Sequence, residues 1–235
     1  MVKYTGKPVY EGIVQGLAVV MKKPDFNIAK RKAEYPEHEI ERVNSAIKLT
    51  KKQIQSFCDQ AITQVGEEGA AIFEVHQIML EDEEFLDTIF HSIRTERVNA
   101  EYAAALAGEN FSKMFAMMDD EYMKARYIDI EDISERLVKN LIGWKETAFE
   151  YKEASVLIAD DITPSAFIQL DKDKIHAFVT INGSIHSHTA ILARMMKMPA
   201  IVGAPLELEK IRTGMQVTVD GNCGDVIFEP YGVDV

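Results

Sequence analysis

The sequence has few cysteines and lacks a long apolar run. Only two cysteines, Cys58 and Cys223, occur among 235 residues. They lie far apart in the sequence, so neither a disulfide framework nor a thiolate metal site is expected. The first residues show no apolar stretch of the signal-peptide kind, and no run approaches the length of a membrane span. We therefore expect a cytoplasmic chain with no membrane association.

Positive charge is also scarce. The chain has 26 Lys and Arg against 38 Asp and Glu, which gives a net charge of -12. Nucleic-acid binding needs clustered cations that replace counterions, so we expect no nucleic-acid partner. The acidic balance fits a basic protein partner or plain solubility. A hydrophobic content of 47% is that of a globular protein.

The middle of the chain predicts a helical region. Apolar residues recur there at spacings of three, four and seven, which is the pattern of amphipathic helices. The expected helices run from Ala33 to a break at Gly66–Gly69, from Ala70 to Arg94, from Ala100 to Met117, and from Tyr122 to Gly143. Asp119 to Glu121 is expected to cap the last one, and Met114 to lie in the core. Short loops between such helices predict a bundle or two helical hairpins.

Both ends of the chain predict strands. The expected strands are two within Lys7–Val20, then Ser155–Ala159, Ala177–Ile181, Ala200–Val202, Gln216–Val219 and Asp225–Phe228, the last two joined by a turn at Gly221–Gly224. The early strands need partners, and the later region supplies them. We therefore expect a discontinuous α/β domain of residues 1–32 and 146–235, interrupted by a helical domain of residues 33–145.

One stretch carries the candidate chemistry. After the apolar run Ala177–Ile181 comes a polar turn with His186 and His188, followed by an amphipathic segment from Thr189 to Lys197. A histidine at a helix start lies beside unpaired N–H groups and the positive end of the helix dipole, a place that stabilises a phosphoryl group. An imidazole that is neutral near pH 7 is a suitable nucleophile for such a group. We therefore predict that His188 carries it.

Several segments together resemble one protein family. They are IADDITPS (Ile158–Ser165), SHTAILAR around His188, PAIVG, VDGNCGDVIFEP, and, in the helical region, AIFEVHQIMLEDEEF and DDEYMKAR. The chain resembles the N-terminal part of Enzyme I of the bacterial phosphotransferase system over nearly its whole length. Loops of the SHT type also occur in pyruvate phosphate dikinase and phosphoenolpyruvate synthase, so the specific part of the likeness is the acidic helical insert together with this loop.

The resemblance implies a fold and an activity. The fold is a swivelling α/β phosphohistidine domain with an inserted four-helix domain. His188 would accept a phosphoryl group from phosphoenolpyruvate, bound with magnesium by a C-terminal barrel that this chain lacks, and pass it to the small carrier HPr. The chain itself would hold no metal. A monomer is expected for this fragment and a homodimer for the full-length enzyme, because the family dimerises mainly through the barrel.

The residues around His188 suit this role, with departures from the family. Ser187, Thr189 and Arg194 are expected to hold the phosphoryl oxygens. The family has a threonine that bonds the active histidine at the position of Phe167. Thr163, Ser165 or a backbone carbonyl would then have to orient the ring. His186 is a second histidine that could carry the group instead.

The partner surface is expected on the helical domain. An acidic cluster is predicted from Glu67, Glu68, Asp82, Glu83 and Glu84, close in space if Gly66 to Gly69 forms a turn. HPr proteins present basic residues, so opposite charge would speed and orient docking. Ile72, Val75, Met79 and Leu80 would add contact area only if they face outward.

Three other readings stay open. His186 and His188, spaced as an HxH pair, could bind a metal with Asp160, Asp161 or His176, as in a metal-dependent hydrolase. The chain could instead belong to a pyruvate phosphate dikinase or phosphoenolpyruvate synthase-like enzyme. Finally, it could be a non-catalytic interaction module whose histidine only satisfies hydrogen bonds.

Overall fold

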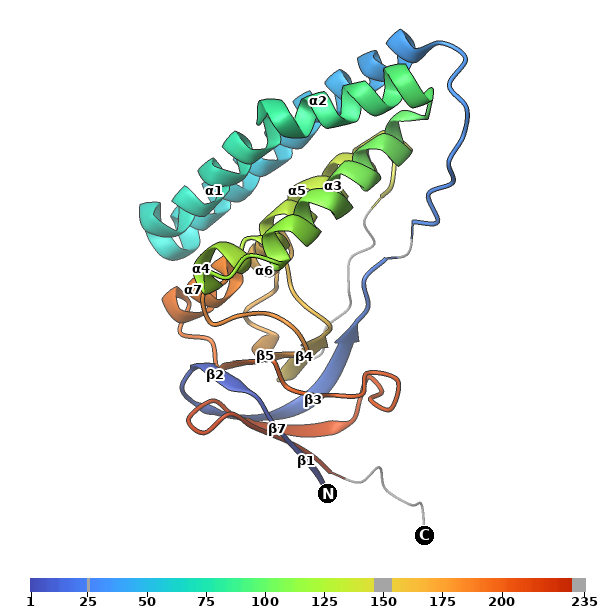
Figure 1. The fold of residues 1–235 in the computed structure, drawn as a ribbon. Helices are drawn as coiled ribbons and strands as arrows, with labels where there is room; N and C mark the ends of the chain where they lie inside the picture. Colours follow the sequence, from blue (N-terminus) through green and yellow to red (C-terminus); the bar gives the residue numbers. More distant parts are fainter. Residues whose placement is uncertain (25, 146–153, 230–235) are drawn as a thin grey trace. The chain divides into compact units, whose positions relative to one another are not determined.

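The chain forms two compact units. The computed structural model describes residues 1–24, 26–145 and 154–229. One unit combines Met1–Pro24 with Ala148–Val235, and the other is Asp25–Thr147. In Figure 1 the first unit carries the blue and the yellow-to-red strands, and the second carries the cyan-to-green helices. Within the described part of the chain, every helix is too short or too polar to cross a membrane.

The first unit is an α/β unit built on one eight-stranded sheet in the order β1-β8-β7-β3-β4-β5-β6-β2. The strands are β1 (Val2–Thr5), β2 (Lys7–Tyr10), β3 (Ile13–Met21), β4 (Ser155–Ala159), β5 (Ile175–Thr180), β6 (Ala200–Val202), β7 (Gln216–Asp220) and β8 (Asp225–Phe228). Two helices, α6 (Pro164–Ile168) and α7 (His188–Met195), connect β4 to β5 and β5 to β6. The sheet therefore mixes βαβ units with hairpins.

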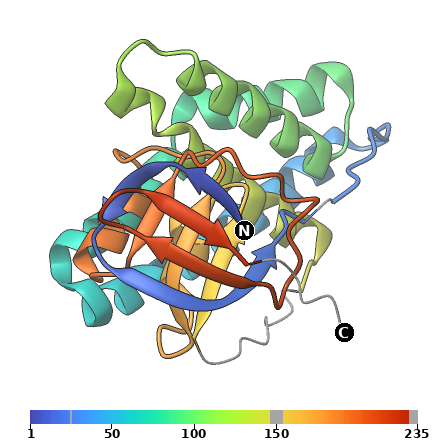
Figure 2. The ribbon, with the colours of Figure 1, turned by 90° about the horizontal axis from the view of Figure 1, so that it is seen from below.

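A single residue closes this sheet on itself. The strands β1 and β2 lie at opposite ends of the strand order, yet only Gly6 separates them in the chain. One residue spans no more than about 3.5 Å, so the two edges must meet. The N–H of Gly6 donates to the carbonyl oxygen of Gly224 at 2.9 Å. Figure 2 shows the result, in which the blue and red strands curl around one side of the unit.

The central strands are parallel and buried. The pairs β3–β4, β4–β5 and β5–β6 are parallel, whereas β3–β7, β7–β8, β1–β8 and β2–β6 are antiparallel. All five residues of β4 are buried, as expected for a parallel strand covered on both faces. Val156, Ile158, Val179 and Ile201, all 0% exposed, lie in one core cluster of this unit. The carboxyl ends of β4, β5 and β6 consequently lie side by side.

The predicted strands of the α/β unit are confirmed, with one omission. The structure has β4, β6 and β8 at the predicted residues, and β7 is one residue longer. Strand β5 begins two residues earlier and ends one residue earlier than the predicted Ala177–Ile181. The early strands pair with the late ones, as the sequence indicated. The strand β1 was missed because Val2–Thr5 is short and largely exposed, so it lacks a clear alternation.

The second unit is a helical unit, and its elements are more divided than predicted. They are α1 (Pro36–Leu80), α2 (Glu83–His91), a π-helical turn (Ser92–Glu96), α3 (Ala100–Ala116), α4 (Glu121–Lys124) and α5 (Tyr127–Ile142). Helix α1 breaks at Gly66, whose φ of 81° and ψ of -177° are not helical. The Sγ of Cys58 contacts the carbonyl oxygen of Ala70, and Lys51 pairs with Glu81. The two halves of α1 therefore run antiparallel, and the predicted break is confirmed.

Capping side chains explain where the other helices stop. Asp82 interrupts the predicted second helix, because its carboxylate accepts the N–H of Phe85 at 3.0 Å and starts α2 anew. Asp120 caps α4 in the same way through the N–H of Met123, at 2.8 Å. Gly143, with φ of 65°, ends α5 in the left-handed conformation. The sequence predicted the last two of these signals and missed Asp82.

Small residues decide which face of α3 is buried. Ala103, Ala104 and Ala107 are at most 1% exposed, and a Cβ on Gly108 would lie 2.4 Å from the Cβ of Ser134 on α5. Close approach of α3 and α5 is thus possible only because these side chains are small. Met114, predicted in the core, is 48% exposed, so that prediction was wrong.

The first domain boundary lies earlier than predicted. The predicted boundary follows residue 32, but the segment before it belongs to the helical unit. Asn99 holds that segment: its Oδ1 accepts the N–H of Arg31 at 2.7 Å, and its Nδ2 donates to the carbonyl of Ala29. Arg31 also pairs with the buried carboxylate of Glu101. The second predicted boundary, between residues 145 and 146, falls at the edge of the described residues.

The closure of the sheet predicts an unequal response of two glycines. Gly224 has φ of 83°, and a Cβ there would lie 2.3 Å from the carbonyl oxygen of Gly6, whereas Gly203 has φ of 67° and open space around it. We expect Gly203→Ala to lower the free energy of unfolding by about 1 kcal/mol and Gly224→Ala by about 3 kcal/mol, because only the second adds a clash to the backbone strain. Urea unfolding followed by circular dichroism measures both, and equal losses would contradict the closure argument.

Candidate functional site

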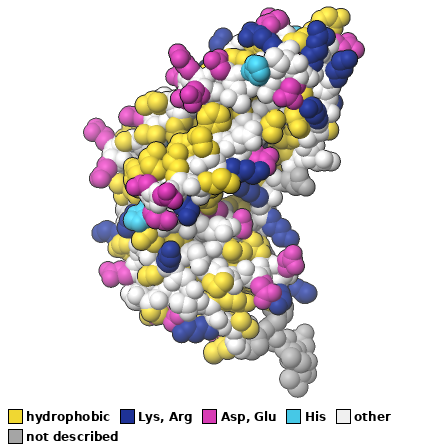
Figure 3. All heavy atoms as spheres, in the orientation of Figure 1, with side chains coloured by type: hydrophobic (Ala, Val, Ile, Leu, Met, Phe, Trp, Pro, Cys, Tyr) yellow, Lys and Arg dark blue, Asp and Glu magenta, His cyan; other side chains and the backbone are white. Residues whose placement is uncertain are grey.

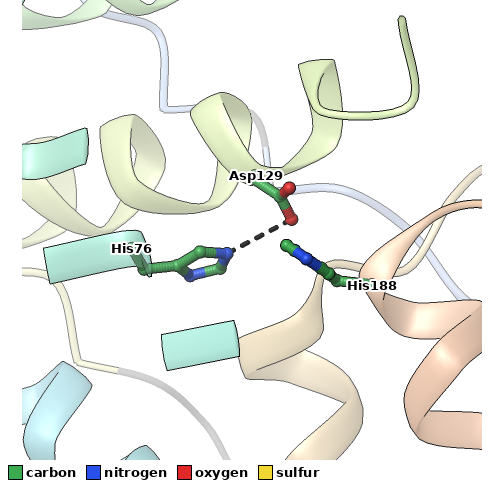
Figure 4. Close-up of side chains that lie close together, drawn as sticks. All are labelled: His76, Asp129 and His188. Atoms are coloured by element: carbon green, nitrogen blue, oxygen red, sulfur yellow. Dashed lines mark hydrogen bonds and ion pairs between the residues drawn. The ribbon is translucent and has the colours of Figure 1, made fainter. Parts of the chain in front are cut away.

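His188 is the first residue of α7. The preceding Ser187 caps the helix, because its Oγ accepts the N–H of Ala190 at 3.1 Å. Such a cap fixes the direction in which a helix starts and stabilises it by about 1 kcal/mol. The side chain of His188 thus extends from the end of α7 where N–H groups and the positive dipole end are found (Figure 4). This is the position that the sequence predicted.

Thr189 fixes the start of α7 to a neighbouring loop. Its hydroxyl donates to the carbonyl oxygen of Ile162 at 2.6 Å. Ile162 lies between β4 and α6, so this bond joins the segments that follow two adjacent parallel strands. The hydroxyl proton of Thr189 is used in this bond. Its expected contact with a phosphoryl oxygen would require the bond to break.

Ser187 and Arg194 keep hydrogen-bonding capacity for an anion. The bond from Ala190 uses an acceptor lone pair of Ser187, so it does not use the O–H proton. Arg194 donates through one terminal nitrogen to the carbonyl of Ile185 at 3.0 Å, which braces the turn before the helix. Burial lowers the pKa of Arg194, but a guanidinium stays protonated in proteins and has five N–H donors.

His186 differs from His188 in its surroundings. It is exposed and precedes the cap residue, and its backbone N–H donates to the Oγ of Ser184 at 3.1 Å. It therefore belongs to the turn and not to the helix end. Among the two histidines of this loop, only His188 lies in the first helical turn.

Phe167 contributes to the core of the α/β unit. It is 1% exposed, and its ring meets that of Phe178 edge-on with centroids 5.4 Å apart. Nearby, Thr163 caps α6 by accepting the N–H of Ala166 at 3.3 Å. The position where the family has a hydroxyl therefore holds a packed aromatic ring in this chain.

The expected metal-ligand set of a hydrolase is not brought together. His176 lies at the beginning of β5. The segment that carries His186 and leads to His188, called the histidine loop, follows the end of β5 at Thr180, roughly 13 Å away along the strand. Asp160 is bonded to the side chain of Asn182 at 3.0 Å. Within the described ranges, no group of potential ligands joins His186 to His188. The geometry gives the hydrolase reading no support.

The predicted acidic surface divides into two. Glu67 and Glu68 lie just after the break of α1, and Asp82 to Glu84 follow its end. All five side chains are exposed. A helix rises 1.5 Å per residue, so the second half of α1 separates the two groups by roughly 20 Å. The expectation that they lie close together was wrong, because the turn at Gly66 places them at opposite ends of one helix.

The helical unit also contains a buried charged cluster that the sequence did not indicate. His76 is a buried residue of α1, and its Nε2 is 3.2 Å from Oδ1 of Asp129 (Figure 4). Its Nδ1 is 3.8 Å from Asp132, and Arg126 donates to Asp129 at 3.2 Å. Burial lowers the pKa of His76, but the hydrogen bond and charge of Asp129 and the charge of Asp132 outweigh it, so the net pKa is raised.

Comparisons with known proteins agree with this architecture. Residues 5–126 match the family described as PEP-utilising enzyme, N-terminal, and residues 151–224 match the PEP-utilising enzyme, mobile domain. The second match contains the histidine loop, and the first covers just over half of the 235 residues. This chain, an α/β unit interrupted by a helical unit, therefore belongs to the PEP-utilising enzymes.

Comparisons with individual proteins narrow the family membership further. Phosphoenolpyruvate-protein phosphotransferases from Geobacillus stearothermophilus and Bacillus subtilis are 38% and 35% identical over 93% of this chain, which spans 38% and 39% of their lengths. The solution structure of an Enzyme I protein (nEIt) is similar with a TM-score of 0.72 at 33% identity, covering 97% of this chain and 93% of that one. The chain therefore corresponds to the N-terminal part of Enzyme I, as the sequence motifs indicated. It spans about two fifths of the curated relatives it matches.

The buried cluster predicts a pH dependence of the helical unit. A histidine whose folded pKa is raised contributes stability that is complete below its unfolded pKa, about 6.5, and is lost as pH rises through the folded pKa. We expect the free energy of unfolding to fall across that window, and His76→Gln to flatten the fall. Trp144, the one tryptophan of the sequence, lies in this unit and reports its unfolding in urea. An unchanged slope in the variant would assign the dependence to other groups.

Proposed function

We propose that this chain is the phosphoryl-relay part of a phosphotransferase of the bacterial sugar phosphotransferase system. His188 would receive the group from phosphoenolpyruvate, bound by a part of the full-length enzyme outside this chain, and give it to HPr. The observation that carries the proposal is the position of His188 at the capped start of α7, within the region that matches the mobile domain. The names of the two relatives favour this relay over a dikinase-like enzyme.

The proposed chemistry consists of two displacements at phosphorus. An imidazole nitrogen of His188 attacks the phosphorus, the P–O bond to the enolpyruvate breaks, and the released enolate takes a proton to become pyruvate. In the second step a histidine nitrogen of HPr attacks, and the P–N bond to His188 breaks. Such transfers depend on alignment and charge stabilisation. In this proposal the O–H of Ser187 and the guanidinium of Arg194 would bind the phosphoryl oxygens, while Thr189 holds the loop through its bond to Ile162.

The donors around His188 suit an anion. Hydroxyls, N–H groups and a guanidinium bind phosphate oxygens, whereas magnesium takes oxygen ligands such as free carboxylates. The carboxylate of Asp160 is bonded to Asn182. We therefore assign the magnesium expected with phosphoenolpyruvate to the remainder of the full-length enzyme, and no step at His188 needs it. A cytoplasmic location, a monomeric fragment and a dimeric full-length enzyme are parts of this proposal.

Two histidine variants test the relay. After mixing with phosphorylated HPr under alkaline conditions that preserve phosphohistidine, we expect the chain to gain the mass of one phosphoryl group. His188→Ala should abolish the gain, because the nucleophile is removed, and His186→Ala should keep it, because His186 lies in the turn before the helix. Mass spectrometry of the intact chain and its peptides measures the gain. A gain that depends on His186 would reassign the nucleophile, and no gain in the unmodified chain would favour the interaction-module reading.

We further propose that HPr docks on the helical unit. Ile72 and Leu80, considered as contact residues, are 5% and 0% exposed and belong to the core. Val75, considered with them, is 40% exposed. Other exposed apolar side chains of the helical unit include Ile78 at the end of α1, Met114 and Met117 at the end of α3, and Tyr122 and Met123 in α4. Figure 3 shows hydrophobic side chains gathered on the helical unit with acidic ones around them. Apolar contacts with an acidic margin suit a basic carrier.

Charge reversal tests which acidic group serves docking. We expect Glu67→Lys with Glu68→Lys to weaken HPr binding about tenfold at low salt, because opposite charges steer and hold the carrier. Glu83→Lys with Glu84→Lys tests the second acidic group, whereas Asp82 is left intact because it caps α2. A charge-matched control is Glu11→Lys with Glu209→Lys on the α/β unit. Calorimetric titration measures the affinity, and a loss no greater than that of the control would remove Glu67 and Glu68 from the docking surface.

A further inference from the structure

Asn182 joins the segments that follow three parallel strands. Its backbone N–H donates to the carbonyl of Asp160 at 2.8 Å, and its Nδ2 donates to Oδ1 of the same residue at 3.0 Å. Its carbonyl oxygen accepts from the hydroxyl of Thr180 at 2.6 Å and from the N–H of Gly203 at 3.4 Å. These partners follow β4, end β5 and follow β6, so one residue links the carboxyl ends of all three strands.

The histidine loop is consequently attached at both ends to the same short segment. Asn182 binds Asp160 before the loop, and Thr189 binds the carbonyl of Ile162 after it. Between these attachments, Gly183 has φ of 101°, and a Cβ there would lie 3.1 Å from Oδ1 of Asp161. The turn therefore passes close to the segment that holds it. Because the loop is fixed at two points and turns tightly between them, the imidazole ring of His188 can occupy few positions.

We propose that Asp160 and Asn182 form a positioning pair that sets the placement of His188 for phosphoryl transfer. Neither side chain needs to touch the phosphoryl group. The amide bonds a carboxylate, and charge-assisted bonds of this kind are stronger than neutral ones. Small displacements of an attacking atom cost large factors in rate, so a loop anchor acts on transfer more than on folding. This inference rests on the proposed relay at His188.

A swap of the two side chains tests the pair. Asn182→Asp places two carboxylates against each other at the present 3.0 Å separation, which removes the donor and adds repulsion. We expect transfer from phosphorylated HPr to this variant to slow about tenfold. The double variant Asp160→Asn with Asn182→Asp restores an amide donor opposite a carboxylate with the roles exchanged. We expect its rate to return to within about twofold of the unmodified chain.

Two readouts separate positioning from a general loss of structure. The final phosphorylated fraction and the melting temperature should stay unchanged while the rate falls, because a merely destabilised chain would lose active molecules instead. The imidazole signals of His188 in NMR spectra should broaden or split in Asn182→Asp and sharpen again in the double variant.

The outcomes distinguish this inference from the relay itself. Transfer at the unmodified rate in Asn182→Asp, or no recovery in the double variant, would overturn the positioning pair. If the unmodified chain accepts no phosphoryl group, the relay fails, and the NMR signals still decide whether the pair holds the histidine. Unaltered His188 signals in Asn182→Asp would then overturn the inference independently.

Discussion

The closure of the sheet through Gly6 is the constraint on which the α/β unit depends. Because β1 and β2 are edge strands separated by one residue, the sheet must curl until both edges meet. Within the curled sheet, the parallel pairing of β4 with β5 and of β5 with β6 aligns these strands. The three parallel strands β4, β5 and β6 consequently end together, and the segments that follow them can bond to each other. The surroundings of His188, which follows β5, are therefore formed by these segments.

Within the α/β unit, the histidine belongs to a well-anchored loop. Ser187 fixes the start of α7, Thr189 binds Ile162, and Asn182 binds Asp160. These bonds lie inside the unit, so they hold whichever partner the unit faces. In the proposed relay the histidine must serve two partners in turn. If the proposed relay holds, the loop would keep these bonds while the whole unit moves, in keeping with the family's description as a mobile domain.

The elements that local sequence could predict are those with strong local signals. The buried strand Ser155–Ala159 is a continuous apolar run, and Gly66 and Gly143 mark helix ends because they adopt left-handed φ. Predictions failed where the decision was tertiary. Met114 has an apolar side chain at helical spacing, but α3 buries its alanines against α5 instead. The acidic groups are a different case, because they were misplaced although the length of the helical segment between them, the second half of α1, is a local property.

At the candidate site, too, local sequence predicted some features, while tertiary contacts decided others. A strand, a polar turn and an amphipathic segment were enough to place His188 at a helix start. The neighbouring Ser187 and Thr189 have the same functional group and flank the same histidine, so local sequence gave them one role. Their hydroxyls differ because Ser187 accepts from its own helix, while Thr189 donates to Ile162, distant in sequence. A hydroxyl that has donated its proton can brace the loop but has no proton left for a phosphoryl oxygen, so the fold assigns the two residues different tasks.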